Sequence, residues 1–216
     1  MNTLAHAESR TNRKPSEGQK VAGNYAKGRL RLHGMEIAIE NPRGSVRSGT
    51  AQNGKLWSVK MPVSYGYIRG TVGADGSQTD CFIGPHLKSP HVFVIDQHDL
   101  GGGDFDEHKC FIGFGSKKQA EEAYCRSFSD GRGRARIGHV ESMSVDDFKK
   151  WLQSGHTRRA IKRAAGGRVG YADGGAPPFE MTSDVPAFDQ TEAAPEEPGK
   201  LAAAGYGAAS GATFNM

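Results

Sequence analysis

The sequence predicts an α+β domain, and three observations lead to that class. Short segments with alternating apolar residues follow one another through the first half of the chain, as successive strands of a sheet do. Two segments with helical spacing come after most of them. Both ends of the 216-residue chain are polar or of low complexity and lack a core pattern. We therefore expect one packed domain between two disordered segments.

Composition divides the chain into four segments. Residues 1–22 are polar and charged, which favours a disordered arm, and the packed domain is expected over residues 23–155. Residues 156–168 carry five Lys or Arg residues and no acid, a pattern that admits a basic helix. Residues 169–216 are acidic and then rich in Ala and Gly. They hold too little apolar surface to offset their ordering entropy, so a disordered tail is expected.

The elements of the domain can be taken in chain order. Alternation, apolar runs and turn signals such as Asn53-Gly54 predict strands over residues 29–33, 35–40, 56–59, 81–83, 91–96, 110–114 and 137–140. The segment 117–128 follows Ser116 and places apolar residues on one side, so it is expected to be a helix. Ser144, with Asp147 three residues on, predicts the start of a second helix that runs through Leu152.

Composition also excludes several classes of protein. No run of 18 apolar residues exists and the N-terminus lacks the apolar core of a signal peptide, so we expect a cytoplasmic protein with no membrane partner. The three cysteines have no C-x-x-C spacing, which predicts reduced thiols, and His108 has no second ligand at zinc spacing. The formal net charge of +4 does not by itself indicate a nucleic-acid partner.

The most informative stretch is residues 65–84. Asp75 and Asp80 flank a turn and stand directly before an apolar strand, where a rigid element can present two carboxylates together. Hard cations such as Mg²⁺ prefer carboxylate oxygens, with water and substrate phosphate completing the coordination. The alternative is an ordinary solvated turn between two strands.

Three motifs in this sequence carry a resemblance to a known family. The runs I-E-N-P at 39–42, Y-G-Y-I-x-G-T at 65–71 and D-G-x-x-x-D-C-F-I at 75–83 resemble those of family I soluble inorganic pyrophosphatases. Residues 23–155 look most like the pyrophosphatase-like domain of phage and prophage polyvalent proteins. The resemblance implies a small closed, mostly antiparallel β-barrel with two flanking helices, and magnesium-dependent hydrolysis of pyrophosphate or a related phosphoanhydride. It also implies a phage or prophage origin and the cytoplasm of a bacterial host.

The resemblance assigns roles to particular residues of this chain. Metal-binding acids are expected at Asp75, Asp80, Asp99 and Asp106, of which Asp75, Asp80 and Asp106 would also be catalytic. Substrate-binding residues are expected at Glu40, Lys60, Tyr65 and Lys109, with either Arg43 or Arg47 as a further phosphate ligand. Lys60, Asp106 and Lys109 could equally be solvated surface charges.

One departure from the family pattern bears on activity. Where the family has D-G-D, this chain has Asp75-Gly76-Ser77, and the resemblance gives the missing acid the role of activating the attacking water. Ser77 cannot accept a proton at neutral pH as a carboxylate does. Weak hydrolysis and non-catalytic binding of a phosphate ligand are therefore both expected alternatives. A third is an interaction module that contacts nucleic acid through residues 156–168, and a homo-oligomer is also compatible with the sequence.

Overall fold

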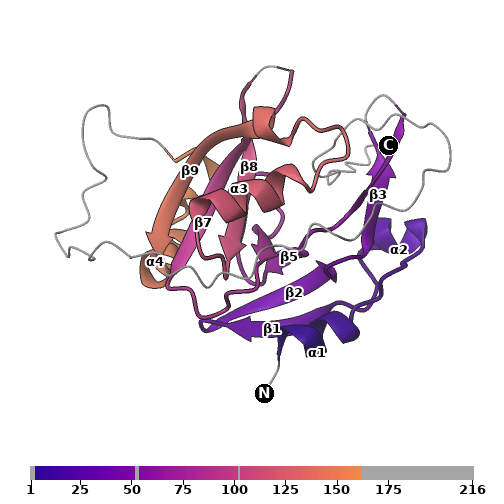
Figure 1. The fold of residues 1–216 in the computed structure, drawn as a ribbon, viewed down its shortest axis with the longest axis horizontal. Coiled ribbons are helices and arrows are strands. Elements are labelled where there is room, and N and C mark those ends of the chain that lie inside the picture. Colours follow the sequence, from indigo (N-terminus) through magenta and orange to yellow (C-terminus); the bar gives the residue numbers. More distant parts are fainter. Residues whose placement is uncertain (1–2, 52–53, 102, 162–216) are drawn as a thin grey trace, which may run out of the picture. The chain divides into compact units, whose positions relative to one another are not determined.

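The computed structural model describes residues 3–51, 54–101 and 103–161, and residues 1–2, 52–53, 102 and 162–216 lie outside that description (Figure 1). The described residues form a mixed α/β fold. Its strands are β1 (Gly28–Leu32), β2 (Met35–Asn41), β3 (Val46–Thr50), β4 (Leu56–Lys60), β5 (Ser64–Ile68), β6 (Asp80–Ile83), β7 (His91–His98), β8 (Phe105–Ile112) and β9 (Ile137–Ser144). Its α-helices are α1 (Leu4–Ser9), α2 (Glu17–Ala22), α3 (Lys117–Cys125) and α4 (Val145–Gln153).

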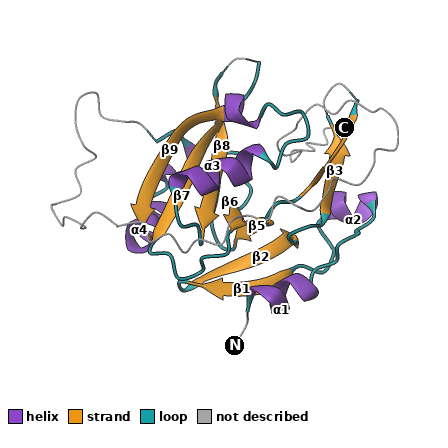
Figure 2. Cartoon of the chain, viewed as in Figure 1, coloured by secondary structure: helices purple, strands orange, loops and turns teal. Residues whose placement is uncertain are grey.

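Seven strands form one sheet in the order β1-β2-β5-β6-β8-β7-β9, and β3 pairs with β4 as a separate hairpin. The sheet is mostly antiparallel as predicted, since within it only β6 and β8 run parallel. The predicted closed barrel is not found, because among the described residues β1 and β9 are the two ends of the strand order. The helix α1 packs against β1 and adds Ala7 to the core on that face of the sheet (Figure 2).

Each face of the sheet supports its own core. One core contains Ile37, Ile39, Val94 and Ile112, together with Trp151 from α4. The other is rich in aromatic residues and is covered by α3. Phe111 stacks on Phe82 with ring centroids 4.7 Å apart, and Tyr124 of α3 packs edge-on against it. Because side chains alternate along a strand, neighbouring residues of β7 and β8 belong to opposite cores.

Serine caps explain where the two predicted helices begin. The Ser116 hydroxyl accepts a hydrogen bond from the Gln119 amide, and the Ser144 hydroxyl accepts one from the Asp147 amide. The helix α3 ends at Cys125, three residues before the predicted end. Its buried side is formed by Ala120, Ala123 and Tyr124, the side that the spacing indicates.

The prediction of a disordered arm over residues 1–22 was wrong for the described part of that segment. In α1, Ala7 is 1% exposed and contributes to the core beneath β1. The Thr11 hydroxyl accepts a hydrogen bond from the Gly28 amide at 2.9 Å and donates to the Ile39 carbonyl at 3.2 Å. A Cβ at Gly28 would lie 1.7 Å from the Ala7 carbonyl oxygen, so glycine permits this approach. The helix is too short for its apolar residues to show a period.

The C-terminal end of the described chain is fastened to the sheet. A 3₁₀ turn spans His156–Arg158, where the Thr157 hydroxyl donates to the Val72 carbonyl at 2.7 Å. The rest of the predicted basic segment and the whole predicted tail lie outside the described residues. Cys81, Cys110 and Cys125 are all free, as expected. Within the described part of the chain, no helix has the length and apolarity needed to cross a membrane.

Candidate functional site

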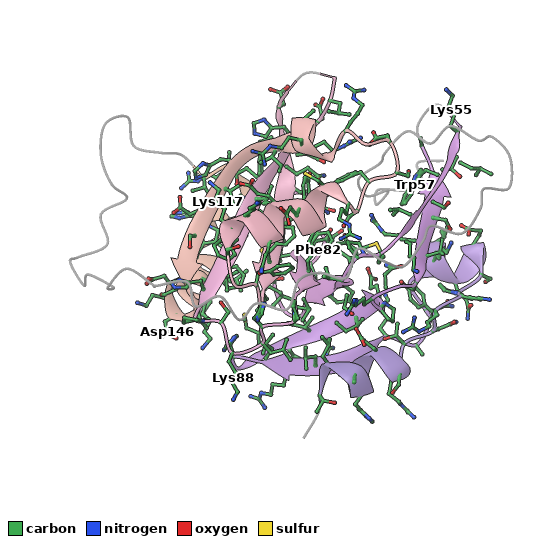
Figure 3. All side chains as sticks on the ribbon, viewed as in Figure 1. Lys55, Trp57, Phe82, Lys88, Lys117 and Asp146 are labelled. Carbon is green, nitrogen blue, oxygen red and sulfur yellow. The ribbon has the colours of Figure 1, made fainter. Side chains whose placement is uncertain are left out.

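A cavity of about 1030 Å³ opens between the β3–β4 hairpin, α2 with its flanking residues, and the adjoining ends of β2, β5 and β6. Five of the sequence-predicted residues line it, namely Glu40, Arg47, Tyr65, Asp75 and Asp80. Figure 3 shows Trp57, another lining residue, on the hairpin and Phe82 at the centre of the molecule. The motifs that the sequence separates by up to forty residues therefore meet at one cavity.

Four side chains form what we call the Lys109 cluster, in which Tyr65 and Asp80 line the inner end of the cavity and Glu107 and Lys109 are buried behind them. The Lys109 ammonium lies 2.5 Å from an Asp80 carboxylate oxygen and 2.7 Å from a Glu107 carboxylate oxygen. The Tyr65 hydroxyl donates to the same Asp80 oxygen at 2.5 Å. The register of the strands places them together, since Asp80 is aligned with Lys109 and with Tyr67, two residues beyond Tyr65 on β5.

Charge and burial set the protonation of this cluster. Burial acts to lower the pKa of Lys109, but Asp80 and Glu107 outweigh that effect and raise it well above its ordinary value. Burial and the adjacent Asp80 carboxylate raise the pKa of Tyr65 well above its ordinary value. At neutral pH Lys109 is therefore an ammonium and Tyr65 a protonated phenol, so both can donate hydrogen bonds.

Glu107 is the member of the cluster that the sequence reasoning missed. It is 6% exposed, and burial raises its pKa to about 7 although Lys109 opposes that rise. The side-chain amide nitrogen of Gln97 donates to the Glu107 carboxylate at 3.2 Å and to the Asp106 carboxylate at 2.7 Å. The side-chain amide oxygen of Gln97 accepts a hydrogen bond from the Tyr124 hydroxyl at 2.8 Å. The sequence does contain a signal for Glu107, because a residue two positions before Lys109 on a strand points to the same side of the sheet.

A second ion pair lies on the cavity wall near Glu40. The Lys27 ammonium contacts the Glu40 carboxylate at 3.2 Å and lies over the rings of Tyr25 and Tyr67, at 4.7 and 5.4 Å from their centroids. Burial and the Glu40 charge raise the pKa of Tyr25. Sequence reasoning did not select Lys27 or Tyr25, because they stand thirteen or more residues before Glu40 and no local pattern joins them.

The structure distinguishes the two candidate arginines. Arg47 lines the cavity, and its guanidinium carbon lies 4.8 Å from the centroid of the Tyr65 ring. Burial acts to lower the pKa of Arg47, but Tyr65 and Asp80 raise it above its ordinary value. Arg43 is exposed and is not among the described residues that line the cavity. Arg47 is therefore the better placed of the two to bind a phosphate.

The remaining predicted residues lie elsewhere. Lys60 is exposed on β4, and the exposed Asp99 accepts a hydrogen bond from the Gly101 amide in the loop before β8. Asp106 is also exposed, and its carboxylate accepts the hydrogen bond from Gln97. None of these three is among the described residues that line the cavity. Asp99 and Asp106 thus do not line the cavity with Asp75 and Asp80, although Gln97 joins Asp106 to Glu107 of the Lys109 cluster, and the roles of both acids stay predictions.

Ser77 stands on the cavity wall in a tight turn. Its amide donates to the Asp75 carboxylate at 2.9 Å, and its carbonyl oxygen accepts from the Gly73 amide at 2.6 Å. Gly76 has a φ of 81°, which glycine adopts without strain. Residue 77 lines the cavity, so an acid at this position, as in the family pattern, would face a bound ligand.

The acids do not form a preformed magnesium site. Within residues 3–51, 54–101 and 103–161, no three His, Cys, Asp or Glu side chains are grouped so that they could hold a metal ion. Asp80 and Glu107 are bonded to Lys109 instead, and Asp75 is bonded to the amide of Ser77. The described donor set therefore does not fit a resident metal, because the ammonium of Lys109 takes the position between the two nearest carboxylates.

The sequence matches the model of the family described as Inorganic Pyrophosphatase over residues 17–153, more than half of the chain. The chain belongs to the inorganic pyrophosphatase family. The match begins at α2, which places that helix inside the pyrophosphatase domain. The finer likeness to phage polyvalent proteins stays a prediction, since the match names only the broader family.

Two solved structures are similar to this pyrophosphatase-family chain. One is an inorganic pyrophosphatase from Neisseria gonorrhoeae, with a TM-score of 0.33 and 17% identity, covering 56% of this chain and 90% of that one. The other is an inorganic phosphatase from Anaplasma phagocytophilum, with a TM-score of 0.32 and 12% identity, covering 59% and 90%. With TM-scores this low, the family assignment rests on the sequence match alone. A comparison with curated proteins gives no match.

Proposed function

We propose that this protein hydrolyses pyrophosphate or a related phosphoanhydride, taken as its magnesium salt. The observation that carries the proposal is the Lys109 cluster at the inner end of the cavity, in a chain of the inorganic pyrophosphatase family. The Lys109 ammonium has a third hydrogen beyond those directed at Asp80 and Glu107, which it can donate to a phosphate oxygen, and Arg47 adds a planar guanidinium that can bind phosphate through two hydrogen bonds.

We propose that magnesium binds together with the substrate, as the counterion of its phosphates. The cavity is lined by five Lys or Arg residues and four Asp or Glu residues, so its charges nearly balance. Such a site is poorly suited to free pyrophosphate, which carries several negative charges, and better suited to a salt whose metal neutralises part of them. Magnesium supplies charge neutralisation to the phosphates when bound. The protein residues bind the oxygens and orient the anhydride.

The test is release of inorganic phosphate by the full chain, with and without magnesium. We expect magnesium-dependent release, and we expect Asp80→Asn to lower kcat/KM by about a hundredfold or more, because the substitution removes the charge that holds Tyr65 and Lys109 in place. Asp146→Asn is the matched control, since Asp146 is exposed in the first turn of α4. Release no greater than that of heat-denatured protein would overturn the proposal.

The second candidate is a domain that binds a phosphate ligand without hydrolysing it, and the observation that favours it is Ser77 on the cavity wall. Binding of methylenediphosphonate in calorimetry, together with no phosphate release, would favour this reading. The proposed contact between residues 156–168 and nucleic acid needs a separate experiment. A truncation for that purpose should end after Ile161, because the Arg159 carbonyl and the Ile161 amide are bonded to buried side chains of the sheet.

A further inference from the structure

The cavity extends well beyond the Lys109 cluster. Its volume of about 1030 Å³ is at the upper end of the range of pockets that enclose drug-sized ligands. Pyrophosphate is only two phosphoryl groups that share an oxygen, so it fills a small part of this space. The inner end accounts for the phosphates, and the outer end, between the hairpin and α2, has room for a further chemical group.

Arg47 joins the inner and outer ends of the cavity. Its guanidinium carbon lies 4.8 Å from the centroid of the Tyr65 ring and 5.3 Å from the centroid of the Trp57 ring. A phosphate bonded to Arg47 therefore has the Lys109 cluster on one side and an indole on the other. Trp57 is held in place by the paired strand, because a Cβ on the opposite residue, Gly49, would lie 2.8 Å from its ring.

The outer end also exposes apolar surface. The large apolar side chains that are exposed in the described part of the chain are Val21, Val46, Leu56 and Val72, and two of them, Val21 and Val46, line this cavity. Val21 is 89% exposed and Val46 is 60% exposed. Pyrophosphate has no apolar surface to place against them. Exposed apolar residues gathered at a cavity are typical of a binding surface.

The polar residues of the outer wall narrow the choice of ligand. Ser48 and Thr50, on the strand paired with that of Trp57, line the outer end of the cavity, and Asn41, which is aligned with Tyr65, lines it nearer the phosphate site. Amide and hydroxyl groups of this kind suit the hydroxyls of a sugar, whereas a hydrocarbon tail would leave them without water and without a partner. An aromatic ring offers a flat surface on which a nucleobase stacks.

We propose that the preferred substrate is a nucleoside 5′-diphosphate or triphosphate, with its phosphates at Arg47 and the Lys109 cluster and its base against Trp57. This inference rests on the proposed function, because it assigns the phosphates to the same cluster. In the reaction a water oxygen forms a bond to the terminal phosphorus, and the bond from that phosphorus to the bridging oxygen breaks. The bridging oxygen keeps the electron pair. A nucleoside diphosphate thus gives a nucleoside monophosphate, inorganic phosphate and a proton.

The test compares two non-hydrolysable probes by calorimetry on the full chain in magnesium buffer. Methylenediphosphonate reports on the phosphate site alone, and α,β-methylene-ADP adds the nucleoside. We expect α,β-methylene-ADP to bind about tenfold more tightly or better, which is the scale of one base stacked on an aromatic side chain. Trp57→Ala should remove most of that preference, measured as the ratio of the two Kd values, because any shift of Arg47, which lies over the indole, affects both probes alike. Trp57→Phe should keep most of it.

The control variant is Leu56→Ala. Leu56 is the neighbouring residue on β4, points to the opposite side of the strand and does not line the cavity, so its removal should leave both Kd values unchanged. Equal affinity of the unmodified protein for the two probes would overturn the nucleoside site and leave the proposed function standing. Binding of neither probe would overturn both. Tighter binding of geranyl diphosphate than of α,β-methylene-ADP would assign the outer wall to a hydrocarbon tail and overturn the inference.

Discussion

The strand β8 contributes to one buried cluster of acidic and basic side chains on each face of the sheet, and the two clusters differ in what covers them. On one face Glu107 and Lys109 belong to the Lys109 cluster, where Asp80 keeps 19% of its side chain exposed at the cavity. On the other face His108 pairs with Asp96 of β7, and their side chains are 1% and 2% exposed. The first cluster thus reaches the cavity wall through Tyr65 and Asp80, whereas His108 and Asp96 do not line the cavity.

The His108–Asp96 pair serves as an anchor for the end of the domain. A ring nitrogen of His108 lies 2.9 Å from an Asp96 oxygen, although the two are not aligned as a hydrogen bond is. The other ring nitrogen lies 3.0 Å from the Arg159 carbonyl oxygen, and the Ile161 amide donates to the second Asp96 oxygen at 2.9 Å. The Trp151 ring packs edge-on against the imidazole. This face is sealed by α4 and by the segment that follows it.

The two clusters together show that the residue types in a buried cluster of acidic and basic side chains do not indicate its role. Both clusters contain an acid and a basic side chain in aligned positions of neighbouring strands. What separates them is the covering layer, which on one face is packed chain and on the other is a cavity. We expect substitutions in the Lys109 cluster to change activity, and substitutions in the His108–Asp96 pair to change stability alone.

The largest effect is expected for Lys109→Met. The substitution leaves the carboxylates of Asp80 and Glu107 buried without their cation, which costs about 3–5 kcal/mol of unfolding free energy. It should also abolish magnesium-dependent phosphate release. Urea denaturation and the phosphate assay measure the two effects. Lys117→Met, at an exposed ion pair of α3, should change stability by less than about 1 kcal/mol. If Lys109→Met kept both stability and activity, the cluster could not be the site.

The pH dependence of stability should depend on Glu107. Burial raises its pKa from 4.5 to about 7, so between these values the folded protein holds a proton that the unfolded chain releases. The contribution of Glu107 to stability is therefore full below pH 4.5 and is lost as the pH rises through 7, by an amount of the order of 3 kcal/mol. Urea denaturation between pH 4 and pH 8 measures the loss, and Glu107→Gln should flatten the curve. A variant curve parallel to the wild-type curve would show that Glu107 is not responsible.

A smaller effect is expected for Asp96→Ala on the sealed face. It leaves the Ile161 amide without its hydrogen-bond partner and removes the carboxylate next to His108, at a cost of about 2 kcal/mol. Asp96→Asn should cost less, because the remaining oxygen can still accept from the Ile161 amide. Both variants should keep kcat/KM within about threefold of wild type. A loss of activity as large as that of the Lys109 variant would show that the two faces are coupled.

The smallest effect is expected for Ser77→Asp, which restores a carboxylate to the cavity wall. If the missing acid limits the rate, kcat/KM for magnesium pyrophosphate should rise about tenfold, which is less than the hundredfold or more that a positioned general base contributes. Ser77→Asn adds nearly the same volume without the charge, so it should give no increase. An equal rise in the two variants would attribute the change to shape and not to proton transfer.

The sequence by itself determined most of the elements and the family. Local signals sufficed for the helix starts at Ser116 and Ser144 and for the strands that show alternation or apolar runs. The motifs around Glu40, Tyr65 and Asp80 identified residues that do line one cavity. Short-range patterns contain this information because helix caps, turns and strand alternation depend on residues within a few positions of each other.

Only the tertiary structure decided which charges meet and which face is open. The contact of Lys109 with both Asp80 and Glu107, the choice of Arg47 over Arg43 and the placement of Asp99 away from the cavity depend on strand order and register. The packing of the N-terminal helix α1 against β1 depends on the buried Ala7 and on the absence of a side chain at Gly28. These contacts join residues that are distant in the chain, and their free energy comes from burial and charge that no local segment possesses.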